Sequence, residues 1–158
     1  MNTPLYPGTP RHQALLRAVA SFYTDDPRIL AVAVFGSLGR GAWDQYSDLD
    51  LDVVLADDMQ IDVIEELHCL CASFATIDEH ALIIEPDDDD AGDVVLASLI
   101  QLSIRYHLLH TTSPNITDSL LVLVSQIDAD VIKRAGQANR NQPNNLLAAS
   151  MNHAMRRA

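Results

Sequence analysis

Two short motifs separated by ten residues contain the side chains best suited to chemistry. The first is Gly36-Ser37, which directly follows an apolar run, and the second is Asp48-Leu49-Asp50. Glycine lets a backbone turn approach a phosphate group closely, and backbone amides after such a turn can point at the anion. Carboxylate oxygens are ligands that suit Mg²⁺. The two motifs therefore predict a phosphate-binding turn beside a divalent-metal site, an arrangement suited to chemistry on a nucleoside triphosphate.

The spacing of the carboxylates fits one face of a strand. Residues i and i+2 of a strand project to the same side, roughly 6.5–7 Å apart along the backbone. Asp48 and Asp50 can therefore converge on one or two Mg²⁺ ions, which two-metal sites hold roughly 3.5–4 Å apart. Asp52 faces the same way but lies roughly 13 Å from Asp48 along the strand, too far to share the pair easily. We expect Asp48 and Asp50 to be the metal ligands.

The segment between the motifs adds two candidate nucleotide-binding residues. The guanidinium of Arg40 could pair with the β or γ phosphate of the nucleotide. Ser47 ends the same segment and, like Arg40, is expected to bind the nucleotide. With Gly36 and Ser37, these residues form the predicted nucleotide-binding set.

The flanking elements must position these residues. A near-continuous apolar run over residues 29–35 predicts a buried strand, and alternation over residues 47–54 predicts a second strand. Thr9-Pro10 has the composition of a helix start, and an apolar stripe at helical spacing follows it. Asp57-Asp58 could cap another helix, whose predicted apolar stripe is Ile61, Ile64, Leu67, Cys71 and Phe74.

The remaining pattern predicts further strands and a C-terminal division. Strands are expected at residues 81–84, 94–96, 100–109 and 120–124, with a turn at 87–92 and a helix from about 128 to 138. The polar stretch NRNQPNN begins at Asn139, and a short helix is expected at 146–157. We therefore predict a main domain over residues 1–138, followed by a linker and short helix over residues 139–158.

Composition excludes several classes of protein. With 22 acidic and 10 basic residues, the chain has a formal net charge of −12. Such a chain lacks the positive surface of a general nucleic-acid binder and needs local cations to accept a triphosphate. Cys69 and Cys71 are expected to be reduced core thiols. Because no run approaches ~20 apolar residues and no leader pattern is present, we expect a cytoplasmic protein without a membrane partner.

The segment GSLGRGAWDQYSDLDLDVV resembles the signature of the DNA polymerase beta-like nucleotidyltransferase superfamily. It is most similar to the small bacterial members, which include antibiotic nucleotidyltransferases and the minimal nucleotidyltransferases of toxin–antitoxin pairs. The resemblance implies an α/β (α+β) fold, with a mixed β-sheet flanked by helices. It also implies ATP or another NTP as co-substrate, Mg²⁺ (two ions) at Asp48 and Asp50, and transfer of a nucleoside monophosphate to an acceptor hydroxyl with release of pyrophosphate.

One departure from the family pattern concerns a third carboxylate. The family usually has this group on a later strand, where it binds metal or acts as a base toward the acceptor. The expected position is occupied by Ser103, and a serine is neither a general base at neutral pH nor a strong metal ligand. Three alternatives follow. Glu85 supplies the group, or the enzyme works slowly with two carboxylates and solvent, or only nucleotide binding remains.

Two functions are consistent with these observations. The first is a nucleotidyltransferase acting on a small-molecule, antibiotic-like acceptor, because the acidic surface disfavours nucleic acid. The second is a catalytically weak or inactive binding module, antitoxin-like, with a helical partner protein; a homodimer is a further arrangement to test. His107 and Arg105 share the predicted cleft face and could contact acceptor or phosphate. His107 and His110 do not form a metal pair, because strand residues i and i+3 face opposite sides.

Overall fold

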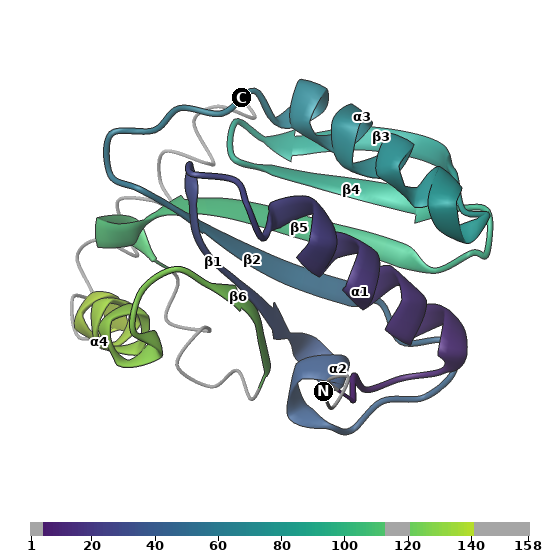
Figure 1. The fold of residues 1–158 in the computed structure, drawn as a ribbon, viewed down its shortest axis with the longest axis horizontal. Helices are drawn as coiled ribbons and strands as arrows, with labels where there is room; N and C mark the ends of the chain where they lie inside the picture. The colour runs from purple at the N-terminus through teal and green to yellow at the C-terminus, as the bar shows by residue number, and fades with distance from the viewer. Residues whose placement is uncertain (1–4, 113–120, 141–158) are drawn as a thin grey trace, which may run out of the picture.

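The chain forms one six-stranded sheet with helices on both of its faces (Figure 1). The computed structural model describes residues 5–112 and 121–140. In chain order, the elements are α1 (Pro10–Tyr23), β1 (Ile29–Phe35), α2 (Gly36–Arg40), β2 (Leu49–Leu55), α3 (Val63–Ser73), η1 (Phe74–Ile77), β3 (Ala81–Asp88), β4 (Ala91–Leu96), β5 (Gln101–Leu108), η2 (Leu109–Thr111), β6 (Leu121–Ser125) and α4 (Ala129–Arg140).

The sheet is mixed, as the sequence predicts. Its strand order is β3-β4-β5-β2-β1-β6. Strands β2 and β5 run parallel, and all other neighbouring strands in this sheet are antiparallel. The parallel pair lies at the centre, so segments far apart in the sequence meet beside the Asp48–Asp50 motif. The predicted α/β (α+β) class with a mixed sheet flanked by helices is confirmed.

Helix α1 begins where the sequence predicts. Pro10 occupies the first helical turn, and the Thr9 side chain caps the helix by accepting a hydrogen bond from the His12 backbone N–H. The buried side of the helix packs against the sheet and includes Leu15, Leu16 and Val19. Helix α1 therefore covers the sheet face opposite the predicted metal ligands.

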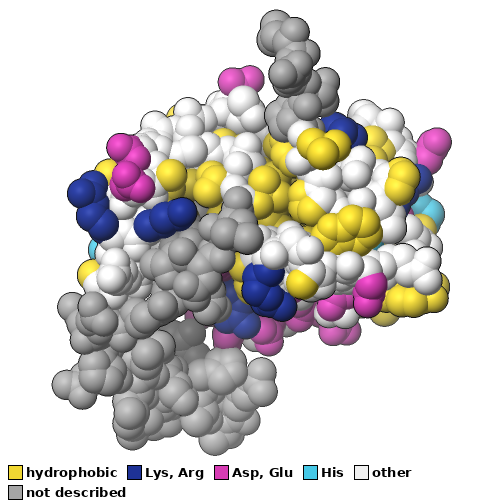
Figure 2. Space-filling view, turned by 90° about the horizontal axis from the view of Figure 1, so that it is seen from below, with side chains coloured by type: hydrophobic (Ala, Val, Ile, Leu, Met, Phe, Trp, Pro, Cys, Tyr) yellow, Lys and Arg dark blue, Asp and Glu magenta, His cyan; other side chains and the backbone are white. Residues whose placement is uncertain are grey.

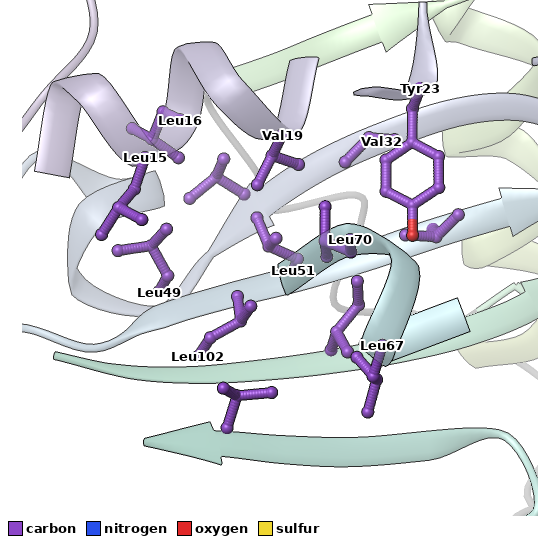
Figure 3. Close-up of a cluster of buried hydrophobic side chains, with 14 of the residues drawn as sticks. Leu15, Leu16, Val19, Tyr23, Val32, Leu49, Leu51, Leu67, Leu70 and Leu102 are labelled. Atoms are coloured by element: carbon purple, nitrogen blue, oxygen red, sulfur yellow. The ribbon is translucent and has the colours of Figure 1, made fainter. Parts of the chain in front are cut away.

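The main core lies between the sheet and the helices α1 and α3. Figure 3 shows leucine side chains from α1, β2, α3 and β5 pointing toward one another within this layer. On β2, Leu49 and Leu51 are fully buried there. Burying one leucine side chain stabilises a fold by about 1.5–3 kcal/mol, so the alternation of β2 fixes which face its aspartates occupy.

The second face of the sheet is only partly covered within the described residues. Ala31 and Ala33 of β1, Val54 of β2 and Ile132 of α4 form a small separate apolar cluster there. This cluster lies toward the end of β2 that is farther from the turn before it. Asp50, near the start of β2, is therefore outside the part of the face that α4 covers.

The structure corrects two predicted boundaries. Helix α3 is capped by Asp62, whose carboxylate accepts from the Glu65 backbone N–H at 3.1 Å, and not by the Asp57-Asp58 pair. Ile61 precedes this helix, and Phe74 follows it in η1. The predicted turn at 87–92 is shorter than expected, because β3 and β4 pair as far as Asp88 and Ala91.

Only part of the region around the predicted division near residue 139 is described by the structure. Helix α4 continues through Asn139 to Arg140, so the helix predicted to end near 138 extends slightly further. The expected short helix at 146–157 and most of the polar linker lie outside the described residues. Among the described helices, none combines the length and apolar character needed to cross a membrane.

Candidate active site

The Gly36-Ser37 turn sits at the end of β1, directly against Asp50 on β2. Gly36 has a φ of +67°, a backbone conformation that favours glycine. A Cβ atom added at Gly36 would lie 2.3 Å from Asp50 Oδ2, so only glycine leaves room for this carboxylate. Phe35 pairs with Asp50 in the antiparallel register of β1 and β2. The two sequence motifs therefore meet through a backbone-to-carboxylate contact.

Hydrogen bonds draw together the two ends of the segment between the motifs. Ser37 Oγ donates to Ser47 Oγ at 3.0 Å, and the Asp44 backbone N–H donates to the same Ser47 oxygen at 2.9 Å. The predicted nucleotide-binding residues Ser37 and Ser47 are therefore brought together. Arg40, the last residue of α2, is exposed.

Helix α1 also holds this segment in place. The Thr9 backbone N–H donates to His12 Nδ1 at 3.0 Å, so the other ring nitrogen, Nε2, is the donor to the Ser47 carbonyl oxygen at 2.8 Å. His12 is fully buried. Sequence reasoning did not identify His12, because its partner Ser47 lies 35 residues away.

Asp50 is half-buried among other carboxylates. Burial is the largest cause that raises its pKa above the ordinary value of 3.8, and the charges of Asp48, Asp52 and Asp93 raise it further. Arg105 acts in the opposite direction. The ionised form of Asp50 is therefore disfavoured in the protein alone, and a bound cation would relieve this.

This donor set fits Mg²⁺. Asp48 is exposed immediately before β2, and Asp50 stands two residues later against the Gly36 turn. Magnesium ions in proteins are usually bound by one or two carboxylates together with water and substrate phosphates. Within residues 5–112 and 121–140, no three His, Cys, Asp or Glu side chains are already arranged to hold a metal ion. Asp48 and Asp50 are therefore a pair that suits this mode of binding.

Asp52 is separated from this pair. It is 1% exposed, and its Oδ1 is 3.0 Å from His107 Nε2, while its Oδ2 has no hydrogen-bond partner among the residues that the structure describes. His110 instead contacts Asp57, with 2.7 Å between Nδ1 and Oδ1, and its backbone N–H bonds the same oxygen. These hydrogen bonds lower the pKa of Asp57. The two histidines therefore contact different aspartates.

The position of the missing carboxylate is part of a row of residues across the sheet. Ser103 on β5 pairs with Asp50 on one side and with Asp93 of β4 on the other. Glu85 of β3 pairs with Asp93 and completes the row at the edge of the sheet. Since neighbouring strands are about 4.8 Å apart, Glu85 stands about 14 Å from Asp50 between Cα atoms. The structure therefore does not bring the proposed substitute Glu85 close to Asp50.

Asp93 is a second residue that sequence reasoning did not identify. Ser103 Oγ donates a hydrogen bond to Asp93 Oδ1 at 2.7 Å. The only sequence signal is a carboxylate inside the otherwise apolar segment that forms β4. That signal becomes informative once the register between β4 and β5 is known.

A cavity of about 150 Å³ opens along this row. Its lining residues are Phe35, Asp50, Asp87, Ala91, Gly92, Asp93, Ser103, Ile104 and Arg105. Pockets that enclose drug-sized ligands measure about 300–1,000 Å³. This cavity therefore has room for one reacting group of a ligand, and the remainder would lie on the open surface beside it.

Comparison with known proteins gives a family and similar folds. The family described as "Nucleotidyltransferase domain" matches residues 14–100. No match is found among curated proteins. A chain from a crystal structure of a toxin–antitoxin with AMP-PNP aligns with a TM-score of 0.50 and 16% identity, covering 89% of this chain and 98% of that one. Terminal uridylyl transferase 4 from Trypanosoma brucei with bound UTP and UpU aligns with a TM-score of 0.41 and 14% identity, covering 69% of this chain and 36% of that one.

The family match includes both motifs and most of the sheet around them. It begins within α1 and includes the Gly36-Ser37 turn, both strands of the motif region and the hairpin that contains Asp93. The similarity to the toxin–antitoxin chain agrees with this assignment at the level of the fold. Because the family match covers more than half of the sequence, the chain belongs to the nucleotidyltransferase domain family.

Proposed function

We propose that this chain is an Mg²⁺-dependent nucleotidyltransferase that moves a nucleoside monophosphate from ATP or another NTP to a hydroxyl group of a small-molecule acceptor. The main support is the contact between Asp50 and the Gly36 turn, where an added Cβ would lie 2.3 Å from Asp50 Oδ2. In this contact, a carboxylate that could bind a metal ion lies directly beside a glycine turn that could bind phosphate. Family membership supports nucleotidyl transfer in general.

The chain's own residues have separate roles in this proposal. Asp48 and Asp50 would hold Mg²⁺, and Gly36 and Ser37 would face the phosphates, with Ser47 fixing the Ser37 hydroxyl. When bound, Mg²⁺ supplies positive charge that offsets the negative charges of the triphosphate and the carboxylates. The acceptor oxygen bonds to the α-phosphorus while the bond from that phosphorus to the pyrophosphate oxygen breaks.

The charge of the site favours a neutral or cationic acceptor. Three aspartates, Asp50, Asp87 and Asp93, line the cavity, together with a single cationic side chain, Arg105. The formal net charge of −12 would repel the phosphate backbone of a nucleic acid. On the face seen in Figure 2, Lys and Arg side chains are dispersed and do not form a continuous basic stripe. A small antibiotic-like molecule with several hydroxyl groups has the required chemistry.

Pyrophosphate release tests this function. We expect the wild-type chain to release pyrophosphate from at least one of the four common NTPs when Mg²⁺ and an aminoglycoside or a simple sugar are present. Asp50→Asn should reduce release by at least 100-fold, because it removes one of two charged ligands. Asp58→Asn, an exposed aspartate outside the cavity, is the matched control and should retain activity. Equal activity of wild type and Asp50→Asn would contradict the proposal.

A second candidate is a binding or regulatory module of the antitoxin-like kind with a helical partner protein. The observation that favours it is the alignment along 98% of a chain from a toxin–antitoxin structure with AMP-PNP. Such a module should bind ATP with Mg²⁺ in calorimetry and release no pyrophosphate with any acceptor. Turnover above the Asp50→Asn background would reject it.

A further inference from the structure

The row of residues across the sheet places one carboxylate on the far side of Ser103 from Asp50. Residues paired in register on adjacent strands point to the same face of a sheet. Asp50, Ser103 and Asp93 are paired in this way across β2, β5 and β4. Two strand spacings separate Asp50 and Asp93, or about 9–10 Å between Cα atoms. Both side chains line the same cavity.

Ser103 orients the Asp93 carboxylate. Its hydroxyl donates to Asp93 Oδ1 at 2.7 Å, which restricts the rotation of that side chain. Both residues are half-buried. Ser103 therefore occupies the position expected for a carboxylate and holds a carboxylate on the next strand.

We propose that Asp93 is the general base of the transfer reaction, and that Ser103 is its positioning residue. This inference rests on the proposed function. In the reaction, the acceptor O–H bond breaks and its proton passes to Asp93, while the acceptor oxygen forms the new bond to the α-phosphorus. The bond to the pyrophosphate oxygen breaks, and pyrophosphate leaves with that electron pair.

The geometry favours a base over a third metal ligand. One carboxylate oxygen of Asp93, Oδ1, already accepts the Ser103 hydroxyl, which leaves the other oxygen to take a proton from the acceptor. The separation of Asp50 and Asp93 leaves room for an attacking oxygen about 3–3.5 Å from the phosphorus. A base must reach that oxygen within about 2.6–3.2 Å. Asp93 lines the same cavity as Asp50, on the other side of Ser103.

Other carboxylates are less suitable. Glu85 is exposed on the edge strand β3, one strand beyond Asp93, and is not among the residues that line the cavity. Asp87 lines the cavity but is outside the paired row of Asp50, Ser103 and Asp93. Glu85 and the exposed Asp58, which are both outside the cavity, provide variants that separate a specific role of Asp93 from a general effect of negative charge.

The experiment measures turnover and nucleotide binding in the same variants. Turnover is pyrophosphate release from ATP with Mg²⁺ and the best acceptor found for wild type, and binding is titration with Mg²⁺ and a non-hydrolysable ATP analogue. Asp93→Asn should lower kcat by about 10²–10⁴-fold, the usual contribution of a general base. Its affinity for the Mg²⁺–nucleotide complex should stay within about threefold of wild type, whereas Asp50→Asn should lose affinity. Asp58→Asn, at an exposed position outside the cavity, should resemble wild type in both assays.

A rescue variant tests the role of the row directly. Ser103→Asp in the Asp93→Asn background puts a carboxylate back on the same face, one strand nearer to Asp50. The kcat of this double variant should be at least tenfold higher than that of Asp93→Asn alone. If Asp93 had only a structural role, the second substitution would not raise kcat. Near wild-type turnover in Asp93→Asn, or loss of turnover in Glu85→Gln instead, would overturn the assignment.

The binding data separate the remaining outcomes. If Asp93→Asn weakens Mg²⁺–nucleotide binding as strongly as Asp50→Asn does, Asp93 is a metal ligand and the assignment as base is wrong. If wild type binds the nucleotide but never releases pyrophosphate, the proposed function fails and the assignment falls with it. If wild type turns over and Asp93→Asn does so equally well, the proposed function stands and only the assignment of Asp93 fails.

Discussion

At the scale of single residues, the site depends on how closely a backbone turn and a carboxylate approach each other. Gly36 supplies both a positive φ and the space that Asp50 Oδ2 occupies. Gly41 also has a positive φ, of +75°, but an added Cβ there would meet nothing within 4 Å. Substitution at Gly41 therefore tests backbone strain alone, whereas substitution at Gly36 tests backbone strain together with displacement of the Asp50 carboxylate.

Replacement of each glycine by alanine should show this difference. Gly36→Ala and Gly41→Ala should each lose about 1–2 kcal/mol of unfolding free energy, because both force alanine into the left-handed region. Gly36→Ala should lose more, since its Cβ displaces Asp50, and should also weaken Mg²⁺–ATP binding at least tenfold. Urea unfolding and calorimetry measure the two effects. Equal nucleotide affinity in both variants would show that the Gly36–Asp50 contact is not needed for binding.

At the scale of elements, local hydrogen bonds decide where helices begin. Asp62 caps α3, whereas the sequence pattern predicts the cap at Asp57-Asp58. Asp57 instead accepts hydrogen bonds from His110, which follows β5. Asp57 therefore contacts a residue 53 positions away in the sequence and does not contribute to the start of α3.

Truncation of the two candidate caps tests this boundary. Asp62→Ala should lower the unfolding free energy by about 1 kcal/mol, because the Glu65 N–H loses its acceptor. For a chain of this size, that change corresponds to a fall of roughly 2–4 °C in Tm. Asp58→Ala, which removes an exposed side chain, should stay within about 0.5 kcal/mol of wild type. Thermal unfolding followed by circular dichroism gives both values. A larger loss of stability in Asp58→Ala than in Asp62→Ala would place the cap at Asp58.

At the scale of the whole molecule, an excess of negative charge gathers at the site. The chain has a formal net charge of −12, and Asp48, Asp52 and Asp93 all raise the pKa of Asp50. The folded protein therefore binds a proton at Asp50 more tightly than the unfolded chain does. In this case, stability falls as the pH rises through the range between the ordinary value of 3.8 and the higher folded value.

Neutralising Asp50 should therefore stabilise the metal-free protein. With EDTA present, Asp50→Asn should have a higher Tm than wild type at pH 7, and the difference should shrink as the pH falls toward 3.8, where wild-type Asp50 is itself protonated. Added Mg²⁺ should raise the wild-type Tm and reduce the advantage of the variant. Thermal scans across this pH range measure the effect. A higher wild-type Tm at pH 7 in EDTA would contradict it.

The sequence by itself determined the features that depend on neighbouring residues. The buried β1, the Gly36 turn and the alternation of β2 follow one another within 30 residues, so composition and spacing predict both their structure and the meeting of Gly36 with Asp50. Family resemblance rests on the same segment. One antiparallel strand pair brings the two motifs together, so their proximity could be predicted without knowledge of contacts between distant parts of the sequence.

Only the tertiary structure decided what surrounds that segment. His12 contacts Ser47, which lies 35 residues further along the chain. Ser103 and Asp93 share a cavity with Asp50 because β5 pairs parallel with β2 and antiparallel with β4. Such registers follow from the burial of many apolar side chains at once, and a strand shifted by one residue would turn Asp93 to the other face. The sequence therefore predicted the Asp48 and Asp50 pair, while the place of Asp93 beside Ser103 could be found only from the fold.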